Sequence, residues 1–254
     1  MRMPSADAEQ QYARTTDNLS ARIAIHAYGT NPQGWFSWLG ERLPDGGDVL
    51  EVGAGTGELW RHLDPRRAGL RLTLVDFSAA MCERLREVPG ADVRQCDAAE
   101  LPFAEGRFDA VIANHMLYHV DDPDAVLREF ARVLRPGGRL FVATNGRGHM
   151  EELFAVATAV GKADVGGTPA RSNFLAEEAP EYIGRHFRDV VSEAYPSSLE
   201  IPAAEPVVAY LASLSGEPLA PEQLAAARDL VQARIDADGH FRVHKHTELI
   251  TATR

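Results

Sequence analysis

The chain has 254 residues, of which 45% are hydrophobic and 25% are charged, and it is long enough to bury the core of a full α/β domain. Its formal net charge of −11 repels phosphate backbones, so we expect no nucleic-acid partner. No apolar run reaches membrane-spanning length and residues 1–7 lack the apolar core of a signal peptide, so we expect no membrane partner and a cytoplasmic location.

Two short amphipathic patterns precede the first strand. Residues 19–26 and 35–39 carry apolar side chains at helical spacing, and Asn31-Pro32 together with Gly34 breaks the chain between them. We therefore expect two helices here, the second of which ends before the turn signals at residues 44–47.

The stretch D-V-L-E-V-G-A-G-T-G at residues 48–57 predicts a strand that runs directly into a glycine turn. Val49, Leu50 and Val52 form the short apolar run of a buried parallel strand, and residues 58–63 then open a helix. Because glycine has no Cβ atom, the backbone can turn sharply here and a ligand can lie directly against it. In a doubly wound sheet such a turn lies at the carboxyl ends of the strands, where nucleotide-like cofactors bind.

The spacing of the glycines disfavours a dinucleotide. The dinucleotide fingerprint is G-x-G-x-x-G, whereas here the third glycine is Gly57 and Glu58 takes the expected position. A phosphate on this turn would also meet the carboxylates of Glu51 and Glu58. The acidic setting therefore favours a cationic ligand, and an NAD-dependent oxidoreductase is the weaker enzyme hypothesis.

An acidic residue ends the second predicted strand, residues 70–75. Asp76 follows about one βα unit after the glycines, which is the separation at which a carboxylate reaches ribose hydroxyls. Its alternative role is to cap the helix predicted over residues 78–85, but Ser78 can serve as that cap. We therefore favour the ligand role for Asp76.

The remaining part of the first half continues to alternate between strands and helices. Short apolar or alternating runs predict strands at residues 91–96, 107–113 and 139–144. A cap at residues 121–124, with proline at a first-turn position, precedes an amphipathic helix over residues 125–134. Pro136 and the glycines after it are expected to end that helix and turn the chain into the next strand.

Beyond residue 145 the pattern predicts four more helices and two more strands. The helices are expected at residues 148–160, 175–187, 205–213 and 221–237. The strands are expected at residues 189–195 and 244–253.

Four motifs in order resemble the class I S-adenosylmethionine (SAM) methyltransferases, in particular the branch that methylates small molecules and quinone carbons. They are E-V-G-A-G-T-G from residue 51, L-P-F from residue 101, F-D-A-V-I from residue 108 and R-V-L-R-P-G-G from residue 132. The resemblance covers about residues 48–145. It implies an α/β, Rossmann-like, doubly wound seven-stranded sheet with helices on both faces and an antiparallel last strand.

The resemblance also implies a domain organisation. Residues 1–45 would form an N-terminal helical segment over the active site, and residues 46–254 would form the SAM-binding domain. Within it, residues 197–240 would be a helical insertion between strands six and seven that caps the substrate. We expect a monomer or a homodimer.

A set of cofactor contacts follows from the family motifs. Asp76 would bind the ribose, Phe77 would flank the adenine, and Asp97 with the backbone of Ala98 would recognise the adenine edge; for Asp97 the alternative is a carboxylate that only stabilises a turn. The full set implied to contact SAM, or its product S-adenosylhomocysteine, is Glu51, Gly53, Ala54, Gly55, Gly57, Asp76, Phe77, Met81, Asp97, Ala98 and Asn114.

Methyl transfer itself needs little from the protein beyond placement. Holding two reactants at near-attack distance accounts for roughly 7–11 kcal/mol of barrier, whereas a positioned base adds about 10²–10⁴-fold. If a base is used, we expect His119 and then His115, which share a face if this turn is helical. The alternative for either histidine is a structural or cofactor-contact role, and His26, His149, Tyr12 and Tyr28 are the other candidate bases. Substrate contacts are expected from Tyr12, His26, Tyr28, Trp35 and Tyr118, for which packing is the alternative.

We expect no metal. The positions after strands four and five, where metal-dependent relatives place carboxylates, hold Asn114 and Asn145, whereas Mg²⁺ favours carboxylate oxygens. His244 and His246 share one face of a predicted strand, but two ligands do not complete a zinc site. The two cysteines, Cys82 and Cys96, have no metal-ligand spacing and predict no disulfide framework.

Three functions remain open at this point. The first is SAM-dependent methyl transfer to an O, N or C nucleophile of a small molecule, in natural-product biosynthesis. The second is a module that binds SAM without catalysis, or a SAM-dependent enzyme of other chemistry. The third is the NAD-dependent oxidoreductase.

Overall fold

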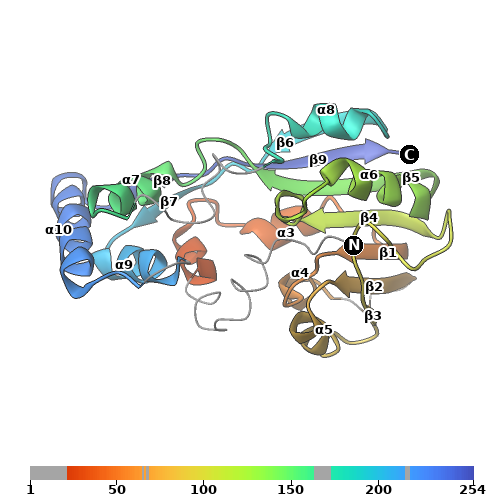
Figure 1. Ribbon diagram of the computed structural model, residues 1–254, viewed down its shortest axis with the longest axis horizontal. Coiled ribbons are helices and arrows are strands. Elements are labelled where there is room, and N and C mark those ends of the chain that lie inside the picture. Colours follow the sequence, from red (N-terminus) through yellow and green to blue (C-terminus); the bar gives the residue numbers. More distant parts are fainter. Residues whose placement is uncertain (1–21, 65, 67–68, 163–172, 215–217) are drawn as a thin grey trace. The chain divides into compact units, whose positions relative to one another are not determined.

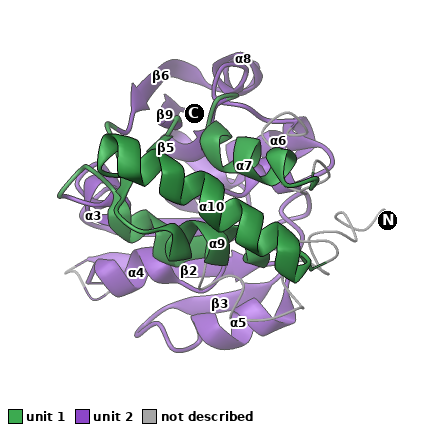
Figure 2. Cartoon of the chain, turned by 90° about the vertical axis from the view of Figure 1, so that its left-hand side faces the viewer, with its two compact units in different colours: residues 1–32, 147–172, 196–246 green, residues 33–146, 173–195, 247–254 purple. Residues whose placement is uncertain are grey.

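The computed structural model describes residues 22–64, 66, 69–162, 173–214 and 218–254. The chain forms two compact units, and each is made of three sequence segments (Figures 1 and 2). The first unit takes residues 1–32, 147–172 and 196–246, and the second takes residues 33–146, 173–195 and 247–254. The glycine turn and the strands around it belong to the second unit.

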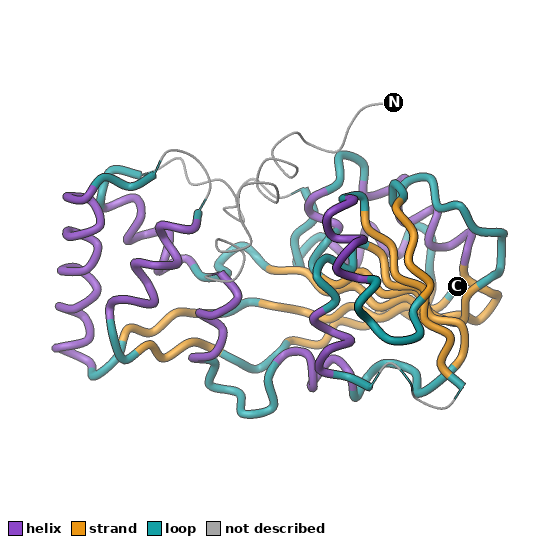
Figure 3. Tube along the Cα trace, turned by 90° about the horizontal axis from the view of Figure 1, so that it is seen from below, coloured by secondary structure: helices purple, strands orange, loops and turns teal. Residues whose placement is uncertain are grey.

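The second unit contains a seven-stranded sheet with the order β3-β2-β1-β4-β5-β9-β6. Figure 3 draws the strands in orange. Its strands are β1 (Gly47–Val52), β2 (Leu70–Asp76), β3 (Asp92–Gln95), β4 (Phe108–Asn114), β5 (Leu134–Asn145), β6 (Arg188–Ala194) and β9 (Thr247–Thr253). β1 to β5 pair in parallel, and β9 pairs antiparallel with both β5 and β6. The predicted doubly wound sheet with an antiparallel last strand is confirmed.

Helices cover both faces of this sheet, because successive strand side chains alternate between two cores. On one face, α6 (Pro123–Val133) and α8 (Ala179–Gly184) pack on residues such as Leu50 and Val52. On the other face, α3 (Trp35–Gly40), α4 (Glu58–His62) and α5 (Ala79–Leu85) pack on residues such as Val49 and Leu74. The central strands of the sheet are thus buried on both faces, whereas the outer strands β3 and β6 are largely exposed.

The first unit has its own hydrophobic core. Its elements are η1 (Ile25–Tyr28), α7 (Glu151–Ala159), β7 (Ser198–Ile201), α9 (Ala204–Ser213), α10 (Pro221–Asp238) and β8 (Phe241–His244). β7 and β8 form a separate two-stranded antiparallel sheet, and Gly29 bridges to Leu199 beside it. Apolar side chains from every one of these elements join one buried cluster.

Three predictions in the second half were wrong in detail. The strand expected over residues 244–253 is two strands, β8 and β9, which belong to different sheets. The alternation of side chains continues through residues 245–246, so the pattern alone gave no sign of the break. The segment 197–240 is not wholly helical, because it contains β7, and the helix expected over 175–187 is confined to Ala179–Gly184.

Smaller differences occur earlier in the chain. β5 begins at Leu134 rather than at residue 139, so the proline and glycines lie within the strand instead of forming a separate turn before it. The start of this strand is irregular, because its register with β4 shifts between Phe108 and Ala110. The helix expected over residues 19–26 lies partly outside the described residues, and residues 25–28 form a 3₁₀ turn.

Candidate active site

The glycine turn between β1 and α4 is fixed to the end of β2. The Ala54 N–H donates to the carbonyl oxygen of Val75 (3.1 Å), and the Gly55 N–H donates to Oδ2 of Asp76 (2.9 Å). Gly53 has φ = 66°, and a Cβ atom there would lie 2.7 Å from Cβ of Met116. Only glycine therefore fits at Gly53, and the turn holds its backbone close to the strand ends.

Asp76 ends β2 and is partly buried. Its Oδ1 accepts from the Ser78 N–H and its Oδ2 from the Gly55 N–H, both at 2.9 Å. Each carboxylate oxygen has about two acceptor positions, so both oxygens can accept another hydrogen bond. Ser78 is the N-cap residue of α5 but makes no capping bond with its side chain, so the prediction that Ser78 caps this helix was wrong. Asp76 accepts from the backbone of Ser78 itself, just before the helix, and keeps acceptor positions for a ligand.

Glu51 lies beneath the turn and is 2% exposed. The indole Nε1–H of Trp60, from α4, donates to its Oε2 at 2.5 Å. Burial raises the pKa of Glu51 to about 8; the bond from Trp60 opposes this rise, and the nearby charge of Asp76 adds to it. Burial likewise raises the pKa of Asp76, and its backbone donors oppose the rise. The turn thus stands over two acidic groups, a setting suited to a cation.

The ends of β2 and β3 lie next to each other, since the Cys96 N–H donates to the carbonyl oxygen of Asp76 at 3.1 Å. Oδ1 of Asp97 accepts from the Ala99 N–H at 2.9 Å, which is the turn-stabilising role considered above, and no hydrogen bond within the described residues uses its Oδ2. Gln95 Nε2 donates to the carbonyl oxygen of Phe77 at 2.9 Å. Recognition of adenine by Asp97 stays a prediction.

Asn114, at the end of β4, is held by Trp35. The indole Nε1–H of Trp35 donates to Oδ1 of Asn114 at 3.1 Å. The Trp35 ring also packs against Trp38, Tyr195 and His115, with centroid distances of 5.5, 5.3 and 5.3 Å. Trp35, expected to contact substrate, therefore has a packing role in this unit and orients the amide of Asn114.

The two candidate bases follow Asn114 but do not share a helical face. His115 has a left-handed backbone with φ = 58°, and the following 3₁₀ turn, η2, contains only Leu117–His119. The two histidines were expected to share a face only if this turn were helical, and His115 lies outside the helical turn. Tyr118 lies between the two imidazoles, with ring centroids 6.3 Å from His115 and 4.5 Å from His119. All three side chains are partly buried at the rim of the sheet.

The other expected substrate residues lie elsewhere. His26 and Tyr28 belong to η1 in the first unit, and Tyr12 lies outside the described residues. His244 and His246 do not share a strand: the His244 N–H donates to Glu152, and the His246 N–H donates to Nδ1 of His149. Among the described residues no cluster of three or more His, Cys, Asp or Glu side chains could hold a metal ion. No helix in that part of the chain is long and apolar enough to span a bilayer.

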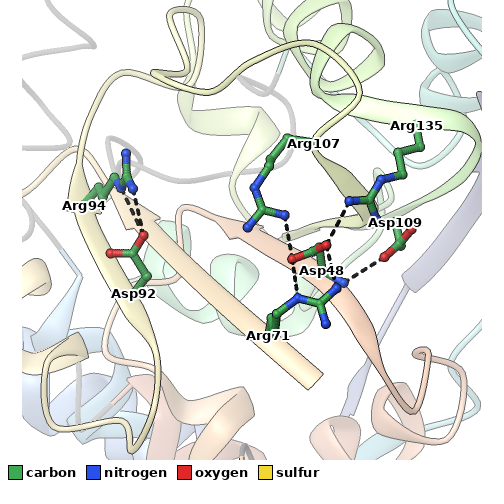
Figure 4. Close-up of polar contacts among 7 residues, drawn as sticks. All are labelled: Asp48, Arg71, Asp92, Arg94, Arg107, Asp109 and Arg135. Carbon is green, nitrogen blue, oxygen red and sulfur yellow. Dashed lines mark hydrogen bonds and ion pairs between the residues drawn. The ribbon is translucent and has the colours of Figure 1, made fainter. Parts of the chain in front are cut away.

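The opposite edge of the sheet, where the strands begin, is built differently (Figure 4). Asp48 is 3% exposed and pairs with Arg71 (2.7 Å), Arg107 (2.5 Å) and Arg135 (2.9 Å), while Arg135 also pairs with Asp109 (2.5 Å). These guanidinium groups hold the pKa of Asp48 well below its usual range. The arginines here are matched by carboxylates, whereas the acids under the glycine turn have no basic partner among the described residues.

The fold and the acidic glycine turn define a doubly wound α/β domain that binds a cationic nucleoside cofactor. Residues 50–142 match the family model described as "Methyltransferase domain". This match agrees with the resemblance of the four motifs to the class I SAM-dependent methyltransferases.

Individual relatives agree with this assignment. The chain is 39% identical over 99 residues to a ubiquinone/menaquinone biosynthesis C-methyltransferase of Desulfotalea psychrophila, covering 38% of this chain and 40% of that protein. It is 36% identical over 127 residues to a phosphatidylethanolamine N-methyltransferase of Cereibacter sphaeroides, covering 46% and 60%. The chain thus matches about half the length of these relatives.

Solved structures extend the similarity of fold over nearly the whole chain. A SAM-dependent methyltransferase of Thermotoga maritima, described as a possible histamine N-methyltransferase, covers 96% of this chain and 98% of its own, with 18% identity and a TM-score of 0.60.

Sequence reasoning missed two residues that shape this site. Trp60 donates to Glu51, and Tyr195 supports Trp35. The sequence gives no local sign of either contact. Tyr195 is far in sequence from Trp35, and Trp60 belongs to an ordinary apolar helix pattern. Asp76, by contrast, was predicted from its place at the end of a strand, and Glu51 from the family motif.

Proposed function

We propose that this protein is a SAM-dependent methyltransferase that transfers a methyl group to an O, N or C nucleophile of a small molecule in natural-product biosynthesis. The observation that carries the proposal is the glycine turn held by Asp76, with Glu51 buried beneath it. Two acids without a basic partner in the described residues suit a ligand that carries a sulfonium and an ammonium, and they oppose a pyrophosphate.

The residues present fit this cofactor. The Asp76 oxygens can each take a ribose hydroxyl, and the Gly53 backbone approaches without a side chain. Met81 in α5 and Ala98 after β3 are buried apolar residues that can pack on the adenosine. SAM supplies a methyl group that is electrophilic because it is bound to a sulfonium. The protein's part is to hold donor and acceptor in line, which accounts for roughly 7–11 kcal/mol of barrier.

The rim after β4 is the proposed source of any base. A neutral imidazole of His119 or His115 can take a proton from the acceptor near pH 7. His115 has a left-handed backbone, an uncommon conformation that is enriched at functional sites, and this is consistent with the proposal. His115 also packs on Trp35, so a structural contribution is part of its role.

A small-molecule acceptor is supported by charge and by the relatives. A net charge of −11 opposes binding to a nucleic acid. By their names, one of the relatives above is a C-methyltransferase of ubiquinone/menaquinone biosynthesis and the other is a phosphatidylethanolamine N-methyltransferase. Residues 1–45 and 197–240 are proposed to enclose the acceptor.

The test is methyl transfer from labelled SAM. Purified protein is incubated with SAM carrying a radiolabelled methyl group and a small-molecule extract of the producing organism, and the products are separated. We expect label in a small molecule and formation of S-adenosylhomocysteine. Binding of SAM without labelled product from any extract would favour the non-catalytic module, and a new product without label would favour other SAM chemistry.

Variants at the rim then assign the base. If His119 acts as the base, His119→Ala lowers the transfer rate about 10²–10⁴-fold with little change in SAM affinity. His115→Ala is the matched comparison. Wild-type transfer rates in both variants would show that placement alone drives the reaction.

A further inference from the structure

Glu51 and Asp76 lie on the same face of the sheet. In the parallel pairing of β1 with β2, Glu51 is in register with Leu74, and Asp76 follows two residues later. Because side chains in a strand alternate with a period of two, Leu74 and Asp76 point to one side, and Glu51 points to that side as well. The two carboxyl groups are therefore diagonal neighbours on adjacent strands.

No cation balances these two acids within the described residues. Within the described residues, the carboxyl of Glu51 accepts a hydrogen bond from Trp60, and that of Asp76 accepts hydrogen bonds from backbone N–H groups, those of Gly55, Phe77 and Ser78. Backbone and indole donors carry no net charge. Two ionised carboxylates in this setting would repel each other, with one of them almost fully removed from water.

The other titratable groups on the elements packed around them do not supply a cation. On α4, Arg61 pairs with Glu58 (3.0 Å) and Glu87 (3.2 Å). Nδ1 of His62 lies 2.8 Å from the carbonyl oxygen of Glu58. α5 and its C-cap carry Arg84 and Arg86, of which Arg86 pairs with Glu83. α5 and the end of β3 also contribute Cys82 and Cys96, whose pKa values are raised by burial, so both thiols are neutral near pH 7. The end of β4 contributes His115, which packs on Trp35.

We propose that Glu51 is a neutral carboxylic acid in the ligand-free protein, that Glu51 and Asp76 carry one proton between them, and that this proton passes to solvent when a cationic nucleoside cofactor binds on the glycine turn. The inference rests on the proposed SAM binding. On binding, the positive charge of the ligand replaces the proton that the two acids share. Binding and proton release are then linked.

The direction of the pKa shifts agrees with this geometry. Burial raises the pKa of Glu51 to about 8, so the acid form predominates at pH 7. A bound cation lowers that pKa, and linkage then makes affinity depend on pH. The dissociation constant for SAM should fall about tenfold for each pH unit between about pH 6 and 7.5, and should level off above pH 8.

Calorimetry measures the released proton directly. SAM is titrated into the full chain at pH 7.0 in phosphate and in Tris, two buffers with different ionisation enthalpies, and the difference in heat gives the number of protons exchanged. We expect release of close to one proton. Equal heats in the two buffers would overturn the inference while leaving SAM binding intact, whereas the absence of any binding would overturn the inference and the proposed function together.

Two variants assign the proton to Glu51. Glu51→Gln keeps the shape of the side chain without a titrating group, so its proton release should be near zero and its SAM affinity should lose the tenfold slope. Any proton exchanged by SAM itself appears equally in this variant and is subtracted. Trp60→Phe removes the only donor to the carboxylate and should move the midpoint of the affinity profile to higher pH. A full proton released by Glu51→Gln would overturn the assignment.

Discussion

At the scale of single residues, Asp76 has two functions that its sequence position did not separate. Its carboxylate holds the glycine turn and the start of α5 through backbone donors, and it is also the proposed ligand of the ribose. A substitution at Asp76 therefore changes the turn as well as the binding site. Loss of binding in such a variant does not by itself identify a ribose contact.

A cofactor analogue separates the two functions. Each charge-assisted hydrogen bond from a ribose hydroxyl to Asp76 should be worth about 1.5–3 kcal/mol, so S-adenosylhomocysteine that lacks one of these hydroxyls should bind the wild type about 10-fold to 150-fold more weakly. Asp76→Asn should bind both ligands weakly and discriminate little between them. Calorimetry over this double-mutant cycle gives the coupling energy. A variant that discriminates as strongly as the wild type would contradict the ribose assignment.

At the scale of elements, the amino ends of four strands are joined by one buried carboxylate. Asp48 starts β1, and its partners Arg71, Arg107 and Arg135 come from β2, the residue before β4 and the start of β5 (Figure 4). The strands carry the binding turn at their other ends. Their alignment therefore depends in part on ion pairs at the edge opposite the ligand.

Asp48→Asn tests this role in stability. Removal of one partner from a buried ion cluster costs several kcal/mol, and because the arginines here are half-exposed we expect the free energy of unfolding to fall by about 2–3 kcal/mol near pH 7. The exposed pair of Asp92 and Arg94 is the control: Asp92→Asn should cost about 0–1 kcal/mol. Denaturant unfolding of both variants measures the difference. Equal losses would show that burial of Asp48 adds nothing.

The same pair of proteins predicts a dependence on pH. The pKa of Asp48 is lowered from its unfolded value of 3.8, so its contribution to stability is fully present above that value and is lost as the pH falls through the folded pKa. The difference in unfolding free energy between wild type and Asp48→Asn should therefore shrink as the pH is lowered from about 5 towards 2. A difference that grows on acidification would contradict the sign of the shift.

The helix before β5 also supports the site from a distance. Arg132, in α6, donates from Nη1 to the carbonyl oxygen of Phe103 (2.7 Å) and from Nη2 to that of Leu101 (2.9 Å), and Glu129 accepts from the Leu101 N–H (2.9 Å). These bonds hold the L-P-F turn that the family resemblance places beside the adenine.

Arg132→Ala should therefore loosen the L-P-F turn. We expect SAM affinity to fall about 5-fold to 20-fold, because two hydrogen bonds of about 1 kcal/mol each are lost from a loop near the ligand. Arg128→Ala, which removes an exposed pair with Asp124 on the same helix, is the matched control and should change affinity less than twofold. Equal SAM affinity of the two variants would show that this turn does not contribute to cofactor binding.

At the scale of the whole molecule, every described residue proposed to contact the cofactor belongs to the second unit, while His26 and Tyr28, proposed for the substrate, belong to the first. SAM at about 100 times its dissociation constant should stabilise the folded state by about 2.7 kcal/mol. Hydrogen exchange should show new protection at residues 53–57 and 76–78 first. Protection confined to the first unit would contradict the proposed location of the cofactor.

The amino-acid sequence by itself determined the sheet, the glycine turn and the two acids around it. These features depend on local patterns, since a buried parallel strand is a short apolar run and a strand end places its next residue at the ligand edge. For the same reason Asp76 could be proposed as a ligand from its position, whereas Glu51 was proposed from the family motif.

Only the tertiary structure decided the features that depend on distant contacts. The alternation of residues 244–253 hid a change from one sheet to another, because side-chain periodicity does not depend on which strand is the neighbour. The bond from Trp35 to Asn114 joins segments far apart in the chain, and the bond from Trp60 to Glu51 depends on how α4 folds back onto β1. The charge state of Glu51 was decided there too, because it depends on which groups surround the carboxyl and exclude water from it.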